Sequence, residues 1–396
     1  MNKIAVFITK GDSFKDIEGE TAQRVSKYLL RDKDEKTLNI FEVEEGDLLK
    51  IKDLHKYEGY EVVVFINGIL FITYEGINVL SRMILNQKEF SVIAPVSNEG
   101  KVLHQRHAPP FLYQTISVFR WAAGEIYKEF KNTIIEVNEV DDFCLVFRKK
   151  LLNVLPDDLN IIDLLQIIKN RGLKIGIAKG VYVHRYGNVY ESGREDLLAH
   201  VPSDAKNILD VGCARGLFGE LLKKRQKCVV TGVDTDNELI NIAKNRLDNV
   251  IHGDIEEILN KGILRTYDCI VCGDLLEHLC NPWKVVKGLK SHLRKEGLFI
   301  ASTPNISNWA IIFEMLKGEW NYVPFSILSG THIRFFTRKT FTELFKEAGY
   351  KIKEISFQSV GVPPLGIEFI AYLKNRMTEI NEEEIKSSEI VIVAEV

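Results

Sequence analysis

One stretch constrains the fold of this chain more than any other: Asn207-Ile-Leu-Asp-Val-Gly-Cys-Ala-Arg-Gly-Leu-Phe-Gly219. Residues 208–211 are mostly apolar and predict a short, buried parallel strand. Gly212 follows that strand, and Gly216 falls where a helix would begin. A strand that turns through glycines into a helix brings bare backbone and a helix N-terminus to a ligand. Because the spacing is Gly-x-x-x-Gly rather than Gly-x-Gly-x-x-Gly, phosphate binding is not its obvious use.

After this turn, strand-like and helix-like stretches alternate up to the last residue. We expect strands at 228–233, 250–251, 267–272, 297–302, 350–357 and 389–396, and helices at 218–225, 237–247, 283–293, 341–348 and 366–376. With the first strand this makes seven strands, which predicts a doubly wound α/β sheet. The short link before the last strand would allow that strand to insert antiparallel.

Three carboxylates are expected at the ends of three neighbouring strands: Asp210, Asp234 and Asp254. An acid about 20 residues after the glycine turn can accept hydrogen bonds from two ribose hydroxyls, and Gly232 would leave room for that ligand. Asp254 is placed to accept from an adenine amino group, and Asp210 to contact a cationic end of the ligand. Each acid taken alone would be better explained as a helix cap or a surface charge. Together with the glycine turn they predict one crevice for an adenosine-bearing cation.

The N-terminal half also alternates. Strands are expected at 4–9, 38–43, 62–66 and 91–96, and helices at 21–30 and 76–85. The β-branched run 62–66 suits a parallel strand buried on both faces, and residues 101–130 are predicted to be less regular. This pattern indicates a second α/β domain. The polar, glycine-bearing stretch 186–193 predicts the linker, so we expect domains at 1–190 and 191–396.

Composition sets outer limits. A length of 396 residues suits two domains, and a net charge of -3 gives no electrostatic case for a nucleic-acid partner. No apolar stretch approaches the roughly 20 residues that span a bilayer, and residues 4–9 predict a first strand rather than a secretory signal. We therefore expect a cytoplasmic protein with no integral membrane segment.

Six cysteines are present, and two of them form the C-x-x-C pair Cys269-Ile-Val-Cys272. Such a pair raises the possibilities of zinc or redox chemistry. It lies in an apolar, strand-like run with no second pair at finger spacing. We therefore expect buried structural thiols and no metal.

The motifs of residues 191–396 resemble those of the class I S-adenosylmethionine-dependent methyltransferases, in particular the ubiquinone-biosynthesis-like subgroup. The matching segments are Leu209-Asp-Val-Gly-Cys-Ala-Arg-Gly216, Val233-Asp234, Gly253-Asp254-Ile255, Tyr267-Asp-Cys-Ile-Val-Cys-Gly-Asp-Leu-Leu-Glu-His-Leu279 with Pro282, Phe299-Ile-Ala-Ser-Thr-Pro-Asn305 and Gly330-Thr-His-Ile-Arg-Phe-Phe-Thr337. One departure is Ala214, which stands where a glycine is common. The resemblance implies a Rossmann-like fold and S-adenosyl-L-methionine as cofactor.

The resemblance also implies which residues contact the cofactor. They are Asp210, Gly212, Cys213, Gly216, Asp234, Asp254, Asp274, Tyr190 and Arg194. Tyr190 and Arg194 resemble the aromatic residue and the arginine that often precede the first strand in this family.

Methyl transfer to an oxygen also requires a base that takes the proton of the acceptor. The candidates are Glu277, His278 and His332, and a histidine titrates near neutral pH. His278 follows the fourth strand, where members of the family approach their substrate. Alternatively, each histidine only packs against a helix and frames the pocket.

Residues 305–330 form an insertion before the last helix of the motif series. Trp309, Ile312 and Phe313 recur there at helical spacing, followed by further aromatics. The insertion is either a helix that packs on the domain or a lid over the acceptor. We expect the lid.

The N-terminal half resembles the tail of a family-2 glycosyltransferase of the GT-A type. Four segments follow in that family's order: Asp142-Phe-Cys-Leu-Val-Phe-Arg-Lys149, Ile162-Asp-Leu-Leu165, Asn170-Arg-Gly-Leu-Lys-Ile-Gly176 and Val183-His184. The metal-binding Asp-x-Asp is missing, because the expected strand end reads Phe65-Ile-Asn-Gly-Ile-Leu70 without a carboxylate. Asn160-Ile161-Ile162 replaces the acidic pair of the usual base. We therefore expect a glycosyltransferase-like domain without that activity, used in docking, in forming a homo-oligomer or in binding the acceptor.

Three functions remain open from the sequence. The first is O-methylation of a sugar or glycan intermediate, which rests on the N-terminal resemblance. The second is methylation of a quinone-like or other small phenolic molecule, which the subgroup resemblance favours. The third is a scaffold that binds the cofactor without transferring methyl.

Overall fold

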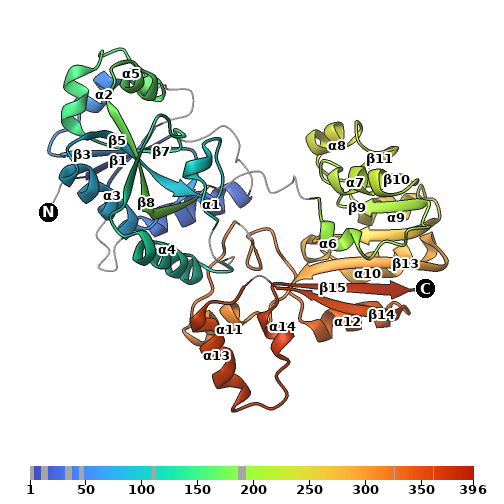
Figure 1. The fold of residues 1–396 in the computed structure, drawn as a ribbon. Helices are drawn as coiled ribbons and strands as arrows, with labels where there is room; N and C mark the ends of the chain where they lie inside the picture. Colours follow the sequence, from blue (N-terminus) through green and yellow to red (C-terminus); the bar gives the residue numbers. More distant parts are fainter. Residues whose placement is uncertain are drawn as a thin grey trace. The chain divides into compact units, whose positions relative to one another are not determined.

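The computed structural model describes residues 4–9, 17–31, 38–43, 49–108, 113–185, 193–324, 326–359 and 361–396. The chain divides into two compact units (Figure 1). The N-terminal unit comprises residues 1–187 and 322–324, and the C-terminal unit comprises residues 188–321 and 325–396.

The C-terminal unit is built on a seven-stranded sheet with the order β11-β10-β9-β12-β13-β15-β14. Its strands are β9 (Asn207–Val211), β10 (Val229–Asp234), β11 (Asn249–His252), β12 (Tyr267–Cys272), β13 (Leu293–Pro304), β14 (Lys351–Gln358) and β15 (Glu389–Glu395). The pairs from β11 to β13 are parallel, and β15 is antiparallel to both β13 and β14. The predicted doubly wound sheet and its inserted antiparallel last strand are confirmed.

Helices alternate with these strands. They are α6 (Glu195–Leu198), α7 (Leu217–Arg225), α8 (Asn237–Ala243), α9 (Ile255–Lys261), α10 (Pro282–Leu289), α11 (Trp309–Leu316), α12 (Arg338–Glu347), α13 (Pro364–Lys374) and α14 (Glu382–Lys386), with 3₁₀ turns η4 (Leu276–His278) and η5 (Lys290–His292). The helix predicted at 283–293 ends earlier, because β13 already begins at Leu293. Helices α9 and α14 were not predicted; at seven and five residues they are too short to display a clear helical period.

Two apolar clusters pack against opposite faces of this sheet. Leu209 and Val211 belong to one cluster and Ile208 to the other, as alternation along a strand requires. The same alternation separates Cys269 from Cys272, which lie in different clusters and are both fully buried. The prediction of buried structural thiols is confirmed, and the two sulfurs face away from each other across the sheet.

The N-terminal unit contains a mixed sheet with the order β2-β1-β3-β7-β5-β8-β4, and β6 pairs with β8. The strands are β1 (Ile4–Thr9), β2 (Asn39–Val43), β3 (Val62–Asn67), β4 (Leu70–Phe71), β5 (Phe90–Ser97), β6 (Ile134–Val137), β7 (Cys144–Arg148) and β8 (Lys174–Arg185). Strand β3 is buried, as predicted, but it pairs parallel with β1 and antiparallel with β7. An apolar run indicates that a strand is buried on both faces, but it does not indicate whether the neighbouring strands run parallel or antiparallel to it.

Helices of this unit are α1 (Ile17–Leu29), α2 (Ile51–His55), α3 (Tyr74–Asn86), α4 (Ile116–Phe130) and α5 (Leu164–Asn170), with 3₁₀ turns η1 (Leu103–Gln105), η2 (Lys149–Val154) and η3 (Ile161–Asp163). Helix α4 shows that the second half of residues 101–130, which were predicted to be less regular, is a regular helix. The Thr115 side chain caps its first turn by accepting from the Val118 N–H at 3.3 Å. Phe119, Ala122 and Ile126 then recur at helical spacing and are buried. Pro109 and Pro110, on which the prediction rested, lie outside the described residues.

Candidate active site

The glycine turn follows β9 and leads into α7. Gly212 (φ 80°) and Gly216 (φ 77°) both adopt left-handed backbone conformations, which glycine tolerates without strain. The Gly212 and Cys213 N–H groups donate to the Val233 carbonyl at 2.8 and 3.0 Å. Ala214 is also left-handed (φ 46°), a conformation that costs an L-residue about 1 kcal/mol. The chain therefore keeps the shape of the turn at the position where the family has glycine.

Asp210 lies directly before this turn and is buried. Its Oδ2 atom is fully buried and has no hydrogen-bond partner among the described residues. Burial raises the pKa of Asp210 to about 7, and the charge of Asp234 adds to this shift. A buried carboxylate without a partner is costly unless a donor or a cation from outside the chain faces it.

Asp234 lies at the end of β10, beside the same turn. Its Oδ2 accepts from the Ala214 N–H at 2.8 Å and its Oδ1 from the Asp236 N–H at 3.0 Å. The carboxylate thus ties the second strand end to the turn after the first. Gly232 corrects one expectation: a Cβ there would lie 2.6 Å from the Cys213 sulfur. The space beside this glycine is filled by the protein's own side chains and is not left for a ligand.

Asp254 follows β11, and Asp234 is in register with the last residue of that strand, His252. The Asp254 side chain caps α9 by accepting from the Glu256 N–H at 2.7 Å. The residue therefore has the helix-cap arrangement that the sequence left open, and it is exposed at the same edge of the sheet.

Arg194 and Asp274 lie together. Arg194 Nη1 contacts Asp274 Oδ2 at 2.7 Å, and its Nη2 contacts Asp196 Oδ2 at 2.8 Å and one carboxylate oxygen of Glu389. The Ser302 hydroxyl donates to Asp274 Oδ1 at 2.8 Å. Glu389 and Ser302 were missed by sequence reasoning, because the contacts of Arg194, which precedes α6, with residues of β13 and β15 leave no spacing signal. Tyr190, the remaining predicted contact, lies outside the described residues.

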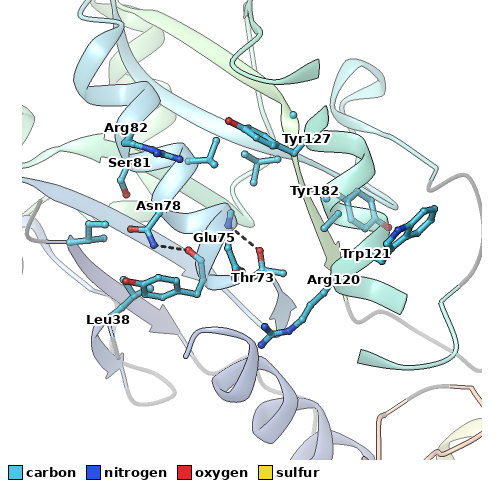
Figure 2. A pocket seen from close by; sticks show the side chains of 18 of the residues that line it. Leu38, Thr73, Glu75, Asn78, Ser81, Arg82, Arg120, Trp121, Tyr127 and Tyr182 are labelled. Carbon is cyan, nitrogen blue, oxygen red and sulfur yellow. Dashed lines mark hydrogen bonds between the residues drawn. The ribbon is translucent and has the colours of Figure 1, made fainter. Parts of the chain in front are cut away.

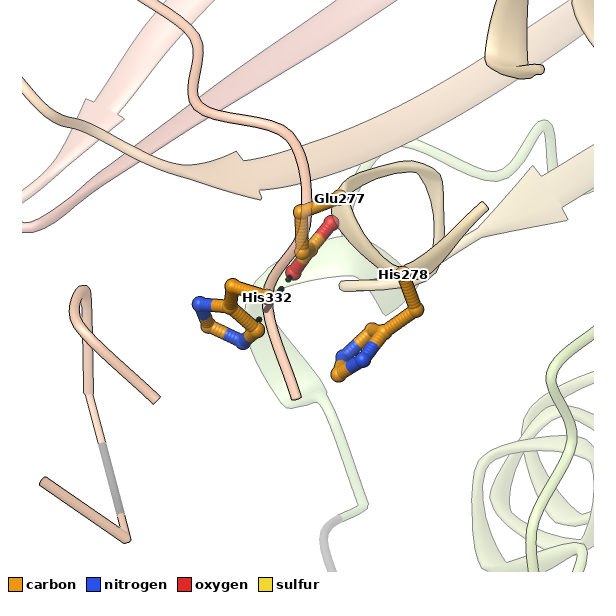
Figure 3. A group of neighbouring side chains, drawn as sticks. All are labelled: Glu277, His278 and His332. Atoms are coloured by element: carbon orange, nitrogen blue, oxygen red, sulfur yellow. Dashed lines mark ion pairs between the residues drawn. The ribbon is translucent and has the colours of Figure 1, made fainter. Parts of the chain in front are cut away.

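Glu277, His278 and His332 form a compact group, which we call the EHH cluster (Figure 3). Glu277 and His278 belong to η4 after β12, and His332 comes from the loop before α12. The carboxylate of Glu277 points toward the His332 ring, with His332 Nε2 4.0 Å from Glu277 Oε1. The two imidazole rings meet edge to face with their centroids 4.7 Å apart. The structure thus brings all three predicted catalytic residues together.

The EHH cluster borders the glycine turn. Val271 of β12 is in register with Asp210 of β9, so the two strands end side by side. A Cβ at Gly212 would lie 3.2 Å from Leu275, the residue that precedes η4. The predicted cofactor turn and the predicted catalytic residues therefore share one edge of the sheet.

Burial dominates the electrostatics of the cluster. It raises the pKa of Glu277 well above the usual range, with Asp274 adding to the shift. It lowers the pKa of His332 to about 4, partly offset by the hydrogen bond to the Ile327 carbonyl. In the free protein the uncharged forms of both side chains are favoured.

The insertion contains a helix, as expected. Helix α11 starts after Asn308, whose side chain accepts from the Ala310 N–H at 3.0 Å. Trp309 is buried, and Phe313 packs edge to face on Phe369 of α13 at 5.2 Å. Helix α11 therefore packs on α13, and its role as a lid stays a prediction.

The N-terminal unit has a cavity of about 1100 Å³ between α3, α4 and β8 (Figure 2). Arg82 and Asn78 line it from α3, Trp121 and Tyr127 from α4, and Tyr182 from β8. Residues 65–70 at the end of β3 contain no carboxylate, as the sequence states, but a distant segment brings one to this strand end. Asp142 Oδ2 accepts from the Asn67 side chain there at 3.3 Å, brought in from before β7.

Several known proteins with related sequences are methyltransferases by name. A family model described as a methyltransferase domain matches residues 182–355. The ubiquinone biosynthesis O-methyltransferase of Coxiella burnetii is 33% identical over 174 residues, 41% of this chain and 70% of that protein. Its namesake from Pasteurella multocida is 29% identical over 143 residues, 32% of this chain and 57% of that protein.

Solved structures give a weaker likeness. A SAM-dependent methyltransferase from Archaeoglobus fulgidus is 18% identical, with a TM-score of 0.39, and the match covers 52% of this chain and 96% of that chain.

The chain belongs to the class I S-adenosylmethionine-dependent methyltransferases and is an enzyme of that class. The cofactor, S-adenosyl-L-methionine, fits the site: the buried, unpartnered Oδ2 of Asp210 is matched to a cationic ligand. None of the helices in the described part of the chain has both the length and the apolarity to cross a bilayer.

Proposed function

We propose that this enzyme transfers a methyl group to an oxygen atom of a small phenolic or quinone-like acceptor. The relative from Coxiella burnetii, by its name an O-methyltransferase of ubiquinone biosynthesis, is the observation that carries the proposal. The sequence alone gave preference to a sugar or glycan acceptor, with the phenolic acceptor as its alternative. That preference rested on the N-terminal resemblance, whereas the similarity to known proteins lies in the C-terminal unit.

The residues at the sheet edge have separate roles in this proposal. Asp210 faces the positive charge of the cofactor, Asp234 accepts from the ribose and Asp254 from the adenine. In the glycine turn from Gly212 to Gly216, which includes Cys213, the cofactor can approach the backbone closely. Arg194, whose guanidinium is engaged by three carboxylates of the chain, positions Asp274 beside the cofactor.

The acceptor binds on the side of the EHH cluster. When bound, the cofactor supplies a methyl group on a positively charged sulfur, and the protein supplies position and electrostatics. His278 or His332 is the candidate base. His332 is oriented for this role, because its Nδ1 is hydrogen-bonded to the Ile327 carbonyl at 2.9 Å and its Nε2 faces Glu277.

A transfer assay with methyl-labelled cofactor tests the function. We expect label in dihydroxyphenols and quinone precursors and none in nucleotide-linked or lipid-linked sugars. Replacing both His278 and His332 by alanine should abolish turnover while cofactor binding survives. Asp234→Ala should instead weaken cofactor binding in calorimetry.

Two outcomes would contradict the proposal. If label is found only in sugars, the acceptor is a glycan and not a phenol. If the protein binds the cofactor but transfers methyl to no acceptor, it is a scaffold protein. Full activity of the double histidine variant would remove both histidines from catalysis.

Three further expectations belong to this proposal. Residues 305–330 serve as a lid over the acceptor. The N-terminal residues 1–190 form a GT-A-like domain that does not catalyse glycosyl transfer. The enzyme works in the cytoplasm. That N-terminal domain would serve in docking to a partner, in homo-oligomer formation or in acceptor binding.

A further inference from the structure

We propose that the cavity of the N-terminal unit binds a small aromatic molecule that carries an acidic group at each end. The cavity has a volume of about 1100 Å³ and lies between α3, α4 and β8 (Figure 2). This volume is at the upper end of the range for small-molecule sites. The residues that line it all belong to the N-terminal unit, so the proposal does not rest on methyl transfer by the C-terminal unit.

The cavity is separate from the strand end at which the sequence lacks the Asp-x-Asp of a sugar-nucleotide site. At that strand end the Thr9 hydroxyl donates to Asn67 Oδ1 at 2.9 Å, and the Asn67 amide donates to Asp142 Oδ2 at 3.3 Å. None of these three residues is among the described residues that line the cavity. The cavity is enclosed by two helices and one strand instead, and its ligand is inferred from its own lining.

The cavity is elongated, with an arginine toward each end. Helix α3 lines it from Glu75 to Arg82 and helix α4 from Arg120 to Tyr127, and each of these segments has a length of roughly 10 Å. Figure 2 shows Arg82 and Tyr127 at one end and Arg120 at the other. Arg82 and Tyr127 also line a second, smaller cavity together, so their side chains are neighbours.

The charge of the lining favours an anion. In the part of the chain that the structure describes, neither Arg82 nor Arg120 forms an ion pair with a carboxylate. The Arg120 guanidinium lies 5.5 Å from the centre of the Tyr28 ring. Among the described lining residues Glu75 is the one carboxylate, and it is exposed. Guanidinium groups bind carboxylates and phosphates through paired hydrogen bonds, so each end of the cavity suits one acidic group.

Aromatic side chains line the space between these ends. They are Tyr74 of α3, Trp121 and Tyr127 of α4, and Tyr182 of β8. Tyr182 is 2% exposed, and its hydroxyl is hydrogen-bonded to the Tyr113 hydroxyl at 3.4 Å, which holds its ring in place. Such rings stack on the flat faces and edges of other aromatic groups, and arginine does the same. The body of the ligand is therefore expected to be aromatic.

Gly124 shows that space is left open beside the middle of α4. It lines the cavity, and a Cβ built on it would meet no atom within 4 Å. Glycine in the interior of a helix is destabilising relative to alanine. Gly76 of α3 differs, because a Cβ there would lie 3.3 Å from Val181 and would be crowded. Packing therefore accounts for Gly76 but not for Gly124, which indicates that the open space itself is used.

Binding is measured by calorimetry on the full chain with a series of two-ring probes. Biphenyl-4,4'-dicarboxylate has an acidic group at each end, biphenyl-4-carboxylate has one, and biphenyl-4-methanol has none. We expect one equivalent of the diacid to bind, with the dissociation constant rising about tenfold at each step along this series.

The location of the bound probe is read from Trp121, the single tryptophan of the N-terminal unit. In protein labelled with 5-fluorotryptophan, the diacid should shift one fluorine resonance. That resonance should be the one that is missing from the spectrum of Trp121→Phe.

Variants of the two arginines test the charge. Arg82→Gln and Arg120→Gln should each weaken binding of the diacid at least about tenfold and leave the neutral alcohol unaffected. The matched control is Lys128→Gln, which removes the same charge from α4 at an exposed position where Lys128 is paired with Glu125 at 2.6 Å. This variant should bind the diacid like the parent.

Gly124→Leu tests the space. Its side chain would project into the cavity and should abolish binding of all three probes, while the thermal unfolding temperature does not fall, because leucine is the better helix former. If this variant folds poorly, the arginine variants and the Trp121 resonance still decide.

Four results would overturn the proposal. They are the absence of saturable binding of the diacid, equal affinity for the diacid and the neutral alcohol, binding without a shift of the Trp121 resonance, and binding by a folded Gly124→Leu variant like that of the parent. Binding of uridine diphosphate in place of the diacid would make the occupant a nucleotide and would overturn the proposal as well.

Discussion

Asp210 shows how one buried carboxylate couples cofactor binding to pH. Its pKa is raised from 3.8 to about 7 by burial, with Asp234 adding to the shift. A raised folded-state pKa means that the group stabilises the free protein at low pH, and that this stability is lost as the pH rises from about 4 to about 7. Burial raises the pKa values of the Cys213 and Cys272 thiols above their usual range, and the charge of Asp210 adds to both shifts.

We predict that cofactor affinity depends on the ionisation of Asp210. A cation favours the ionised form, so binding of S-adenosylmethionine should tighten by up to about tenfold from pH 6 to pH 8. Calorimetry at several pH values measures this. Asp210→Asn is the control, since it retains the shape and removes the titration; an equal pH dependence in both proteins would exclude Asp210 as its source.

At the scale of elements, Arg194 joins four segments of the C-terminal unit. It begins α6 and contacts Asp274 after β12, Ser302 in β13 and Glu389 in β15. Its side chain is 18% exposed. Burial, with the nearby Asp274 adding to the shift, raises the pKa of Glu389 to about 8, although the charge of Arg194 acts in the opposite direction. Removing the arginine would leave the Glu389 carboxyl, which is 18% exposed, and the more exposed carboxylates of Asp196 and Asp274 without the cation that they share.

We predict that Arg194→Gln destabilises the C-terminal unit strongly. Loss of one partner from a buried charged network costs about 3 to 5 kcal/mol. Urea denaturation at neutral pH measures the free energy of unfolding. The matched control is Lys224→Gln, which breaks the exposed pair with Glu220 and should cost about 0.3 to 0.5 kcal/mol. If both variants lose the same small amount, the network does not hold these elements together.

At the scale of the whole molecule, the match to the methyltransferase family lies mainly in one of the two units. The methyltransferase family model matches residues 182–355, which include most of the C-terminal unit. The N-terminal unit has its own sheet and a cavity of about 1100 Å³. Its strand end at Asn67 carries one carboxylate, Asp142, hydrogen-bonded to the asparagine side chain. One carboxylate already committed to a hydrogen bond is a poor ligand set for Mg²⁺.

We predict that the full chain binds no nucleotide sugar in a manner that requires Mg²⁺ or Mn²⁺. Calorimetric titration of a uridine diphosphate sugar, with and without the ion, tests this. Asp142→Asn identifies the location of any binding that is seen. Tight, ion-dependent binding that this variant abolishes would show a working transferase site in the N-terminal unit.

The fold of the C-terminal unit and most residues of the candidate site could be predicted from the sequence, because the patterns that indicate them involve residues close together in the chain. The β9 strand, the glycine turn and the acids at three strand ends are read from neighbours along the chain, because strand burial and turn chemistry depend on a few adjacent residues. The same holds for the buried Cys269 and Cys272, whose run of apolar neighbours predicted their burial. Helix α4 was missed because Pro109-Pro110 indicated a break in residues 101–130, and a proline pair does not show where the next helix begins.

What the sequence could not supply is the set of contacts between distant segments. Gly232 was interpreted as space for a ligand, but Leu247 and Cys213 fill that space. No spacing rule brings Glu389 to Arg194 or Asp142 to Asn67, because such pairs depend on which strands become neighbours in the sheet.

By itself the sequence determined the class of enzyme, its cofactor and the identity of the residues at the sheet edge. Short motifs encode these, because turn shape and strand ends are local properties of the chain. Only the tertiary structure decided that Glu277, His278 and His332 share one group, in which Glu277 is buried and His278 is half-buried. Their convergence depends on packing of the loop before α12 against η4, which desolvates the Glu277 carboxylate and leaves one oxygen without a partner.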